Sequence, residues 1–135
     1  MNLIYLTHCS NQKDDSLRKG HKKVTPDKLY REKFIKKFME KCKKEKVNWA
    51  IFSDKYGVWF PDKKRSWYDK PPESVDDKEF RNLAADIENK LKDYKRIYFY
   101  KDKVKSHPFY KEIFNSTKIS EKVEFFSELS MIGNI

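Results

Sequence analysis

Short runs of apolar and aromatic residues alternate with longer segments that carry apolar residues at helical spacing, and this alternation constrains the fold most strongly. Four such runs are expected to be strands: Leu3–Thr7, Trp49–Phe52, Arg96–Tyr100 and Val123–Phe126. Trp49–Phe52 is apolar without interruption, which is typical of strands buried on both faces of a sheet. The order predicts an α/β fold in a single domain, residues 1–135, with a mostly parallel four-stranded sheet flanked by helices.

Two of the intervening segments are predicted to be amphipathic helices. The first extends from Asp27 to about Lys46, with apolar residues four positions apart. The second extends from Asp76 to Asp93 and is capped by Ser74 or Asp76. A shorter helix is expected to begin at Pro108, because proline is favoured in the first helical turn. The apolar positions of these helices are Tyr30, Phe34, Phe38 and Cys42; Phe80, Leu83, Ala84, Ile87, Leu91 and Tyr94; and Phe109, Tyr110, Ile113 and Phe114.

Basic residues are in excess, with 31 Lys and Arg against 21 Asp and Glu, which gives a formal net charge of +10. A field of this sign attracts phosphates, so we expect a nucleic acid or a nucleotide as partner. The alternative is that the lysines only form a solvated surface. The 3 Trp, 8 Tyr and 10 Phe residues indicate a packed core, since disordered chains are poor in aromatic residues.

The sequence also bears on location. No apolar run approaches the length of a membrane-spanning helix, and no basic face is paired with a strongly apolar one, so we expect no membrane partner. The only cysteines are Cys9 and Cys42, without a CxxC motif, which favours a reducing compartment. The first residues do not have the features of a signal peptide. We therefore expect a cytoplasmic protein.

The usual cofactor-binding motifs are missing from the sequence. Neither a GxGxxG motif nor a Walker A loop can be formed from three glycines, at positions 20, 57 and 133. The three histidines do not have the spacing of metal ligands, and they lie at positions 8, 21 and 107. We therefore expect neither a cofactor nor a metal ion.

Two loops, residues 8–26 and 53–72, follow the first two predicted strands and are expected to form a site. In parallel sheets, ligands bind beyond the carboxyl ends of the strands. The first loop carries Ser10 and Lys13, and the second carries Lys55. A hydroxyl and two ammonium groups at one edge of a sheet suit an anion, so we predict that these residues hold a phosphate.

Reactive groups in the same loops suggest chemistry on the bound ligand. Asp62 and Asp69 lie seven positions apart, and a pair of carboxylates can act on a glycosidic carbon. The alternative is that they cap turns, since Pro-Asp is a common turn dipeptide and Pro61 directly precedes Asp62. Cys9 is either a nucleophilic thiolate, its pKa lowered by Lys13, or a structural residue at a strand end.

The remaining candidates in the second loop are predicted to contact the ligand directly. Tyr56 and Tyr68 are expected to orient a nucleobase, because aromatic rings stack on bases. Ser53 and Gly57 are expected to line the phosphate site with Lys55. Aromatic residues in a small domain are often part of the core instead, and this alternative applies to both tyrosines.

The motif CSxxK at Cys9–Lys13 and the motif SxKYGxxxPDxxxxxYD at Ser53–Asp69 resemble those of a family of small uncharacterised α/β domains, which is distantly similar to the peroxide-stress protein YaaA. Leu29–Phe34 resembles the family's LYxxxxF motif with one position fewer, and Leu129–Gly133 resembles a shortened form of its closing segment. The resemblance implies an α/β fold whose motifs form a cleft. On the YaaA side it also implies DNA binding and protection from oxidative damage.

These observations lead to one predicted function and two alternatives. The predicted function is an enzyme-like domain that acts on a nucleotide or nucleic acid at a glycosidic bond, with a cleft that holds phosphate. The first alternative is a non-catalytic DNA-binding protein, similar to YaaA, that acts through its basic surface. The second is a small viral or host-interaction protein that uses the fold only as a scaffold.

Overall fold

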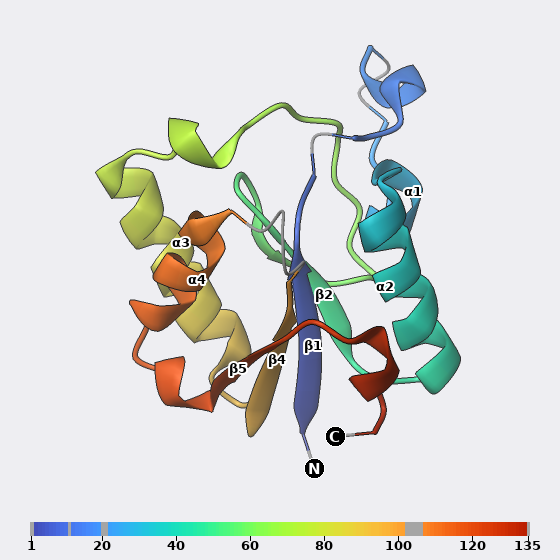
Figure 1. Ribbon diagram of the computed structural model, residues 1–135. Coiled ribbons are helices and arrows are strands. Elements are labelled where there is room, and N and C mark those ends of the chain that lie inside the picture. The colour runs from blue at the N-terminus through green and yellow to red at the C-terminus, as the bar shows by residue number, and fades with distance from the viewer. Residues whose placement is uncertain (1, 11, 20–21, 102–106, 135) are drawn as a thin grey trace.

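Five strands form a single mixed sheet at the centre of the molecule (Figure 1). The computed structural model describes residues 2–10, 12–19, 22–101 and 107–134. The α/β class and the single small domain agree with the prediction. The strands are β1 (Leu3–His8), β2 (Trp49–Ser53), β3 (Gly57–Trp59), β4 (Arg96–Tyr100) and β5 (Val123–Phe126). The α-helices are α1 (Pro26–Leu29), α2 (Lys33–Glu45), α3 (Asp77–Leu91) and α4 (Pro108–Asn115).

The strand order, β3-β2-β1-β4-β5, places β1 in the centre. β1 pairs in parallel with β2 and β4, and β4 pairs in parallel with β5. Figure 1 shows α2 on one face of the sheet and α3 and α4 on the other. The chain moves from β1 to β2 in one direction and later to β4 and β5 in the other, so right-handed crossovers put these helices on opposite faces. The carboxyl ends of β1, β2 and β4 therefore meet at one edge.

The predicted number of four strands is wrong, because β3 lies in a segment that was predicted to be a loop. β3 pairs antiparallel with β2, so the sheet is mixed. Gly57 has a φ of +74°, which lets the chain reverse direction directly after the turn at residues 54–56. Val58 and Trp59 are buried against the rest of the core. A strand of three residues is too short to show the alternation by which strands are recognised in a sequence.

The helix predicted from Asp27 to Lys46 is interrupted after its first turn, because the chain is extended at Tyr30. The backbone of Tyr30 pairs with Lys13, and the Arg31 amide donates to the Gln12 carbonyl at 2.7 Å. These contacts with the loop after β1 replace helical hydrogen bonds and divide the segment into α1 and α2. Tyr30 consequently faces the predicted site loops instead of continuing the apolar stripe of α2.

The starts of the later helices agree with their sequence signals. Asp76 caps α3, since its side chain accepts a hydrogen bond from the Glu79 amide at 2.8 Å, and Glu79 accepts one from the Asp76 amide at 3.1 Å. α4 begins at Pro108, and the imidazole Nδ1 of His107 accepts a hydrogen bond from the Phe109 amide at 3.1 Å. α4 therefore presents its amino end at the edge where β4 ends.

The two predicted site loops are held against each other. Val24 of the first loop and Arg65 of the second exchange backbone hydrogen bonds of 2.9 and 2.8 Å. Residues 11, 20 and 21 of the first loop and Ile135 of the tail lie outside the described part of the chain. In the tail, the Gly133 amide donates to the Tyr5 hydroxyl at 3.2 Å and Ile132 is fully buried. Within the described ranges, no helix has the length and apolar character needed to cross a membrane.

Candidate functional site

A cavity of about 430 Å³ lies at the edge of the sheet where β1, β2 and β4 end. β2 and β4 lie on either side of β1, so this edge is the point at which the strand order reverses, the usual ligand site of such sheets. The cavity brings together residues from five separate parts of the chain. They are His8, Cys9, Ser10, Gln12, Lys13, Glu32, Phe34, Asp54, Asp69, Lys70, Pro71, Pro72, Glu73, His107 and Tyr110.

Asp54 is the most unusual of these side chains, since it is 2% exposed at the end of β2. One of its carboxylate oxygens, Oδ2, accepts a hydrogen bond from the Tyr110 hydroxyl at 3.3 Å. The other, Oδ1, is buried and has no hydrogen-bond partner among the described residues. Burial raises the pKa of Asp54 from 3.8 to about 6, although the Tyr110 hydroxyl and the Cys9 thiol oppose this rise. Asp54 therefore exchanges a proton close to neutral pH.

Cys9 lies next to this carboxylate, with its Sγ 3.5 Å from the Tyr110 hydroxyl. Burial, together with the negative charge of Asp54, raises the pKa of the Cys9 thiol to about 11. This direction is opposite to the lowering by Lys13 on which the nucleophile alternative depends. Cys9 is a protonated thiol at neutral pH, which favours the structural alternative over the nucleophile.

Aromatic rings form one wall of the cavity. The His8 ring is stacked between Phe34 and Tyr110, with ring centroids 5.4 and 4.9 Å apart. Phe34 is in turn stacked on Tyr100 at 4.6 Å. Phe34 is half-buried at the start of α2, and Tyr110 is buried in α4, so helices on both faces of the sheet contribute to this wall. Phe34 and Tyr110 therefore already have stacking partners within the protein.

Lys13 is 8% exposed and its ammonium lies among aromatic rings. The Nζ atom is 4.3 Å from the centre of the Tyr68 ring and 6.0 Å from the centres of the Tyr30 and Trp67 rings. The hydroxyls of Tyr30 and Tyr68 are 2.6 Å apart and share a hydrogen bond, so the rings are fixed to each other. Burial lowers the pKa of Lys13, and neighbouring carboxylates such as Asp69 oppose this.

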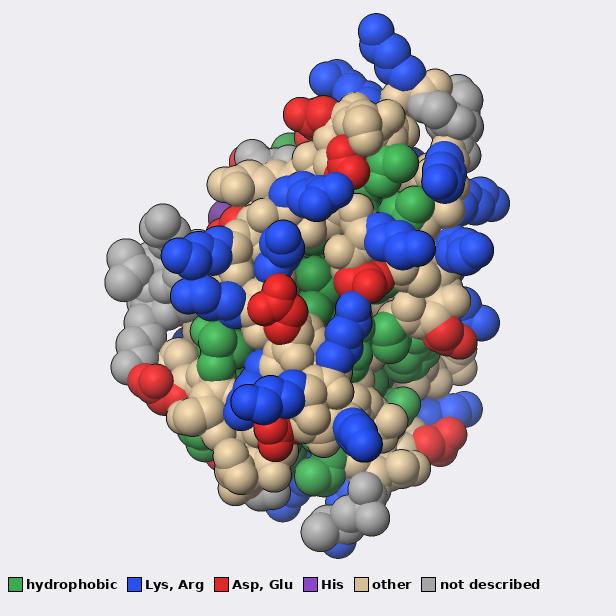
Figure 2. Space-filling view, turned by 90° about the vertical axis from the view of Figure 1, so that its right-hand side faces the viewer, with side chains coloured by type: hydrophobic (Ala, Val, Ile, Leu, Met, Phe, Trp, Pro, Cys, Tyr) green, Lys and Arg blue, Asp and Glu red, His purple; other side chains and the backbone are tan. Residues whose placement is uncertain are grey.

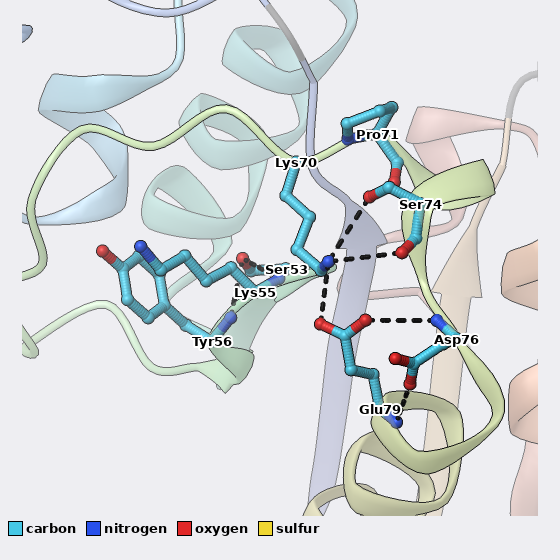
Figure 3. A network of polar contacts seen from close by, with 8 residues as sticks. All are labelled: Ser53, Lys55, Tyr56, Lys70, Pro71, Ser74, Asp76 and Glu79. Carbon is cyan, nitrogen blue, oxygen red and sulfur yellow. Dashed lines mark hydrogen bonds and ion pairs between the residues drawn. The ribbon is translucent and has the colours of Figure 1, made fainter.

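The outer rim of the cavity is formed by residues 69–73, which are attached to the start of α3 (Figure 3). The Lys70 Nζ binds the Glu79 carboxylate at 2.8 Å and the Ser74 hydroxyl at 3.3 Å. Asp69 is exposed on this rim. Ser10 lies at the cavity as well, and its hydroxyl accepts a hydrogen bond from the Gln12 amide at 3.1 Å.

The four predicted ligand contacts at the end of β2 and in the turn after it lie outside this cavity. The Ser53 hydroxyl accepts hydrogen bonds from the amides of Lys55 and Tyr56, at 3.2 and 3.1 Å, and so shapes the turn after β2 (Figure 3). Lys55, Tyr56 and Gly57 line a separate hollow of about 260 Å³ beside α3. Tyr56 also donates a hydrogen bond to the Ser66 carbonyl at 3.0 Å. The phosphate set Ser10, Lys13 and Lys55 is therefore divided between two hollows.

Asp62 also lies outside the cavity, and it is separated from Asp69. It is exposed in a turn in which the Lys63 amide donates to the Phe60 carbonyl at 3.1 Å. The adjacent Trp59 indole donates to the Lys63 carbonyl at 2.8 Å and holds this turn against the core. The turn-forming alternative accounts for this environment of Asp62. Tyr68 does not line the cavity directly but lies beneath Lys13.

Sequence reasoning missed the residues that face Lys13 across the cavity. Asp54 directly follows β2, so the strand-end rule that selected Ser53 and Lys55 applied to it equally. His107 and Tyr110 follow β4, and the same rule would have drawn attention to them once β4 was placed beside β1. No group of three or more His, Cys, Asp or Glu side chains is arranged to hold a metal ion in the part of the chain that the structure describes.

Comparisons with known proteins give no further guide to this site. No family model, no curated protein and no solved structure matches the chain. The chemistry of the cavity is therefore argued from its own side chains.

Proposed function

We propose that the cavity binds a nucleotide, either free or within a nucleic acid, and that the protein acts on the bond between its base and its sugar. The observation that carries this proposal is Asp54, a carboxyl group with a raised pKa and a buried oxygen that has no partner among the described residues. Such a group is suited to proton transfer near neutral pH. Its place at the reversal point of the sheet is the usual location of a nucleotide.

Asp54 replaces Asp62 as the proposed reactive carboxyl group. In its protonated form it donates its proton to the departing base, which leaves as a neutral molecule. Positive charge develops on C1′ of the sugar as this bond breaks, and the nearby carboxylate of Asp69 stabilises it. A water molecule then adds to C1′ and gives its proton to the Asp54 carboxylate, which leaves the free sugar and restores the acid. Glu32 and Glu73 also line the cavity, and they add to the negative potential that favours this charge. The four carboxyl groups of the cavity suit a cationic transition state.

The base and the phosphate of the ligand are proposed to occupy different walls. The base is proposed to lie against the aromatic wall at Phe34 and Tyr110, which both line the cavity. The phosphate lies at the amino end of α4, where the helix carries partial positive charge. Nδ1 of His107 accepts the Phe109 amide, so Nε2 is the free ring donor, and it lies 3.8 Å from the Glu73 carboxylate. The phosphate is proposed to take this donor in place of Glu73, together with the Ser10 hydroxyl.

The test is the release of free base, measured by chromatography, from nucleosides, nucleoside 5′-monophosphates and single-stranded and duplex oligonucleotides. Asp54→Asn is expected to lower the rate by about a hundredfold or more, because the proton donor is lost. Asp62→Asn is the matched control and is expected to leave the rate unchanged, since Asp62 is exposed outside the cavity. Equal rates for wild type and Asp54→Asn would refute the proposal.

A second candidate function, non-catalytic binding of nucleic acid, is supported by the outer face of α2. Figure 2 looks onto this side of the molecule, and Lys and Arg side chains are spread over it with Asp and Glu between them. The basic residues of α2 and its cap that are exposed are Lys33, Lys36, Lys37, Lys43, Lys44 and Lys46, against a single exposed acid, Glu40. This is the function that the resemblance to YaaA implies.

The second candidate is tested by the salt dependence of duplex DNA binding. Lys36→Ala/Lys37→Ala removes two charges from α2, and each charge that contacts a phosphate lowers the slope of log K against log salt by about 0.9. Lys78→Ala/Arg81→Ala removes two exposed charges from α3, on the opposite face, and is expected to leave the slope unchanged. Equal slopes for the two double variants would exclude α2 as the contact surface.

A further inference from the structure

Lys13 lies in an unusual environment for a lysine. The side chain is buried, and it forms no ion pair with any other residue in the described ranges. Its nearest neighbours are the π faces of Tyr68, Tyr30 and Trp67. Buried lysines are usually paired with a carboxylate, because an unpaired charge loses its hydration without compensation. Around Lys13 the aromatic rings, with the negative charges of Asp69 and Asp54 beyond ion-pair distance, take the place of such a partner.

The burial of Lys13 favours a reactive amine, and it acts against the rings and carboxylates around Nζ, which stabilise the ammonium. Burial lowers the pKa of Lys13, so a larger share of the amine is neutral at a given pH. Only the neutral amine is a nucleophile, and lysines in this kind of pocket form imines with carbonyl compounds. The backbone of Lys13 is fixed by its pairing with Tyr30. The rings of Tyr30 and Tyr68, which contact its ammonium, are fixed to each other by a hydrogen bond. The Nζ atom is therefore held in place before a ligand arrives.

A proton donor is available in the same cavity. Forming an imine from an amine and an aldehyde expels water, and an acid must protonate the departing hydroxyl. Asp54 lines the cavity with Lys13 and has a buried oxygen without a partner among the described residues. Asp54 is held by Tyr110 on its other oxygen, at 3.3 Å, which orients the carboxyl group.

We propose that Lys13 forms an imine with the C1′ aldehyde of a ring-opened pentose in the cavity. This inference rests on the proposed function, which leaves such a sugar once the base has departed. The Nζ lone pair attacks C1′, and a proton passes from nitrogen to the former carbonyl oxygen. Asp54 then protonates the hydroxyl, which leaves as water while the nitrogen lone pair forms the C=N bond. The products are a protonated imine, water and the Asp54 carboxylate.

The experiment traps this imine with sodium cyanoborohydride, which reduces it to a stable secondary amine. The full chain is incubated with 2-deoxyribose 5-phosphate, a probe that already carries the aldehyde and needs no base release. One adduct is expected by intact mass, on the peptide that contains Lys13. Lys13→Arg is expected to lower the adduct about tenfold or more, because a guanidinium does not form an imine under these conditions. Lys23→Arg, at an exposed lysine, is the matched control and is expected to change nothing.

The outcomes separate this inference from the proposed function. Adduct spread over surface lysines, at equal levels in wild type and Lys13→Arg, would overturn the inference even if base release is observed. Adduct on Lys13 without base release would support the imine and count against the glycosidic reaction. Peptide mapping of the wild type locates the adduct by itself, so the result does not depend on how well Lys13→Arg folds. Equal trapping rates in wild type and Asp54→Asn would overturn the role of Asp54 as proton donor.

Discussion

At the scale of single residues, Asp54 determines how the cavity responds to pH. The rise of its pKa from 3.8 to about 6 means that the folded protein binds the proton more tightly than the unfolded chain. The free energy of unfolding therefore falls as the pH rises between these two values, by about 3 kcal/mol in total. Asp54→Asn removes this loss and is expected to stabilise the protein by about that amount above pH 6, with no gain below pH 3.8.

Denaturant titrations across this pH range measure the effect, with Asp62→Asn as the control at an exposed carboxyl group. The control is expected to change the free energy of unfolding by less than about 0.5 kcal/mol at every pH. An Asp54→Asn variant that is less stable than wild type above pH 6 would mean that the carboxylate has an unrecognised partner. A gain in the free energy of unfolding that is the same at every pH would mean that packing, and not the titration of Asp54, causes the effect.

At the scale of elements, the β2–β3 hairpin depends on Gly57 and its contact with α3. A Cβ atom at Gly57 would lie 2.1 Å from the Asp86 Oδ2, and that oxygen accepts a hydrogen bond from the Val58 amide at 2.8 Å. Gly57→Ala is therefore expected to destabilise the protein by about 2–4 kcal/mol, from the positive φ and the displaced carboxylate together. Denaturant unfolding measures the change. The control is a double-mutant cycle with Asp86→Ala. If Gly57→Ala lowers the free energy of unfolding equally in the wild type and in Asp86→Ala, the clash between the new Cβ and the Asp86 carboxylate contributes nothing.

At the scale of the whole molecule, the layered architecture follows from sequence patterns, but the site does not. Apolar runs and helical spacing predict β1, β2, β4, β5, α3 and α4 because each of these elements buries a continuous face. The break at Tyr30 is set by its pairing with Lys13, a partner distant in sequence. The strand at Gly57 pairs with the neighbouring β2, and it is also held by the distant Asp86 of α3, which accepts the Val58 amide. Tertiary contacts override the local preference at both places.

The same reasoning explains which site residues were predicted. Ser10 and Lys13 directly follow β1, so their position at the edge is fixed by the strand itself. Asp69 lines the cavity only because its loop returns across the sheet edge and is held there by Lys70 and Glu79. Asp62 lies in the same loop, yet the turn after Pro61 directs it to solvent. Motif spacing alone does not distinguish these two carboxylates.

The most direct test of the central claim is an NMR titration of the ¹⁵N-labelled protein with nucleoside 5′-monophosphates, which is practical for a chain of 135 residues. If the cavity binds nucleotides, the largest changes in amide chemical shift will occur at Cys9, Lys13, Asp54 and Tyr110. Changes confined to the lysines of α2, or no change with any nucleotide, would contradict the claim. The first of these results would favour the nucleic-acid-binding alternative, and the second would remove the nucleotide as ligand.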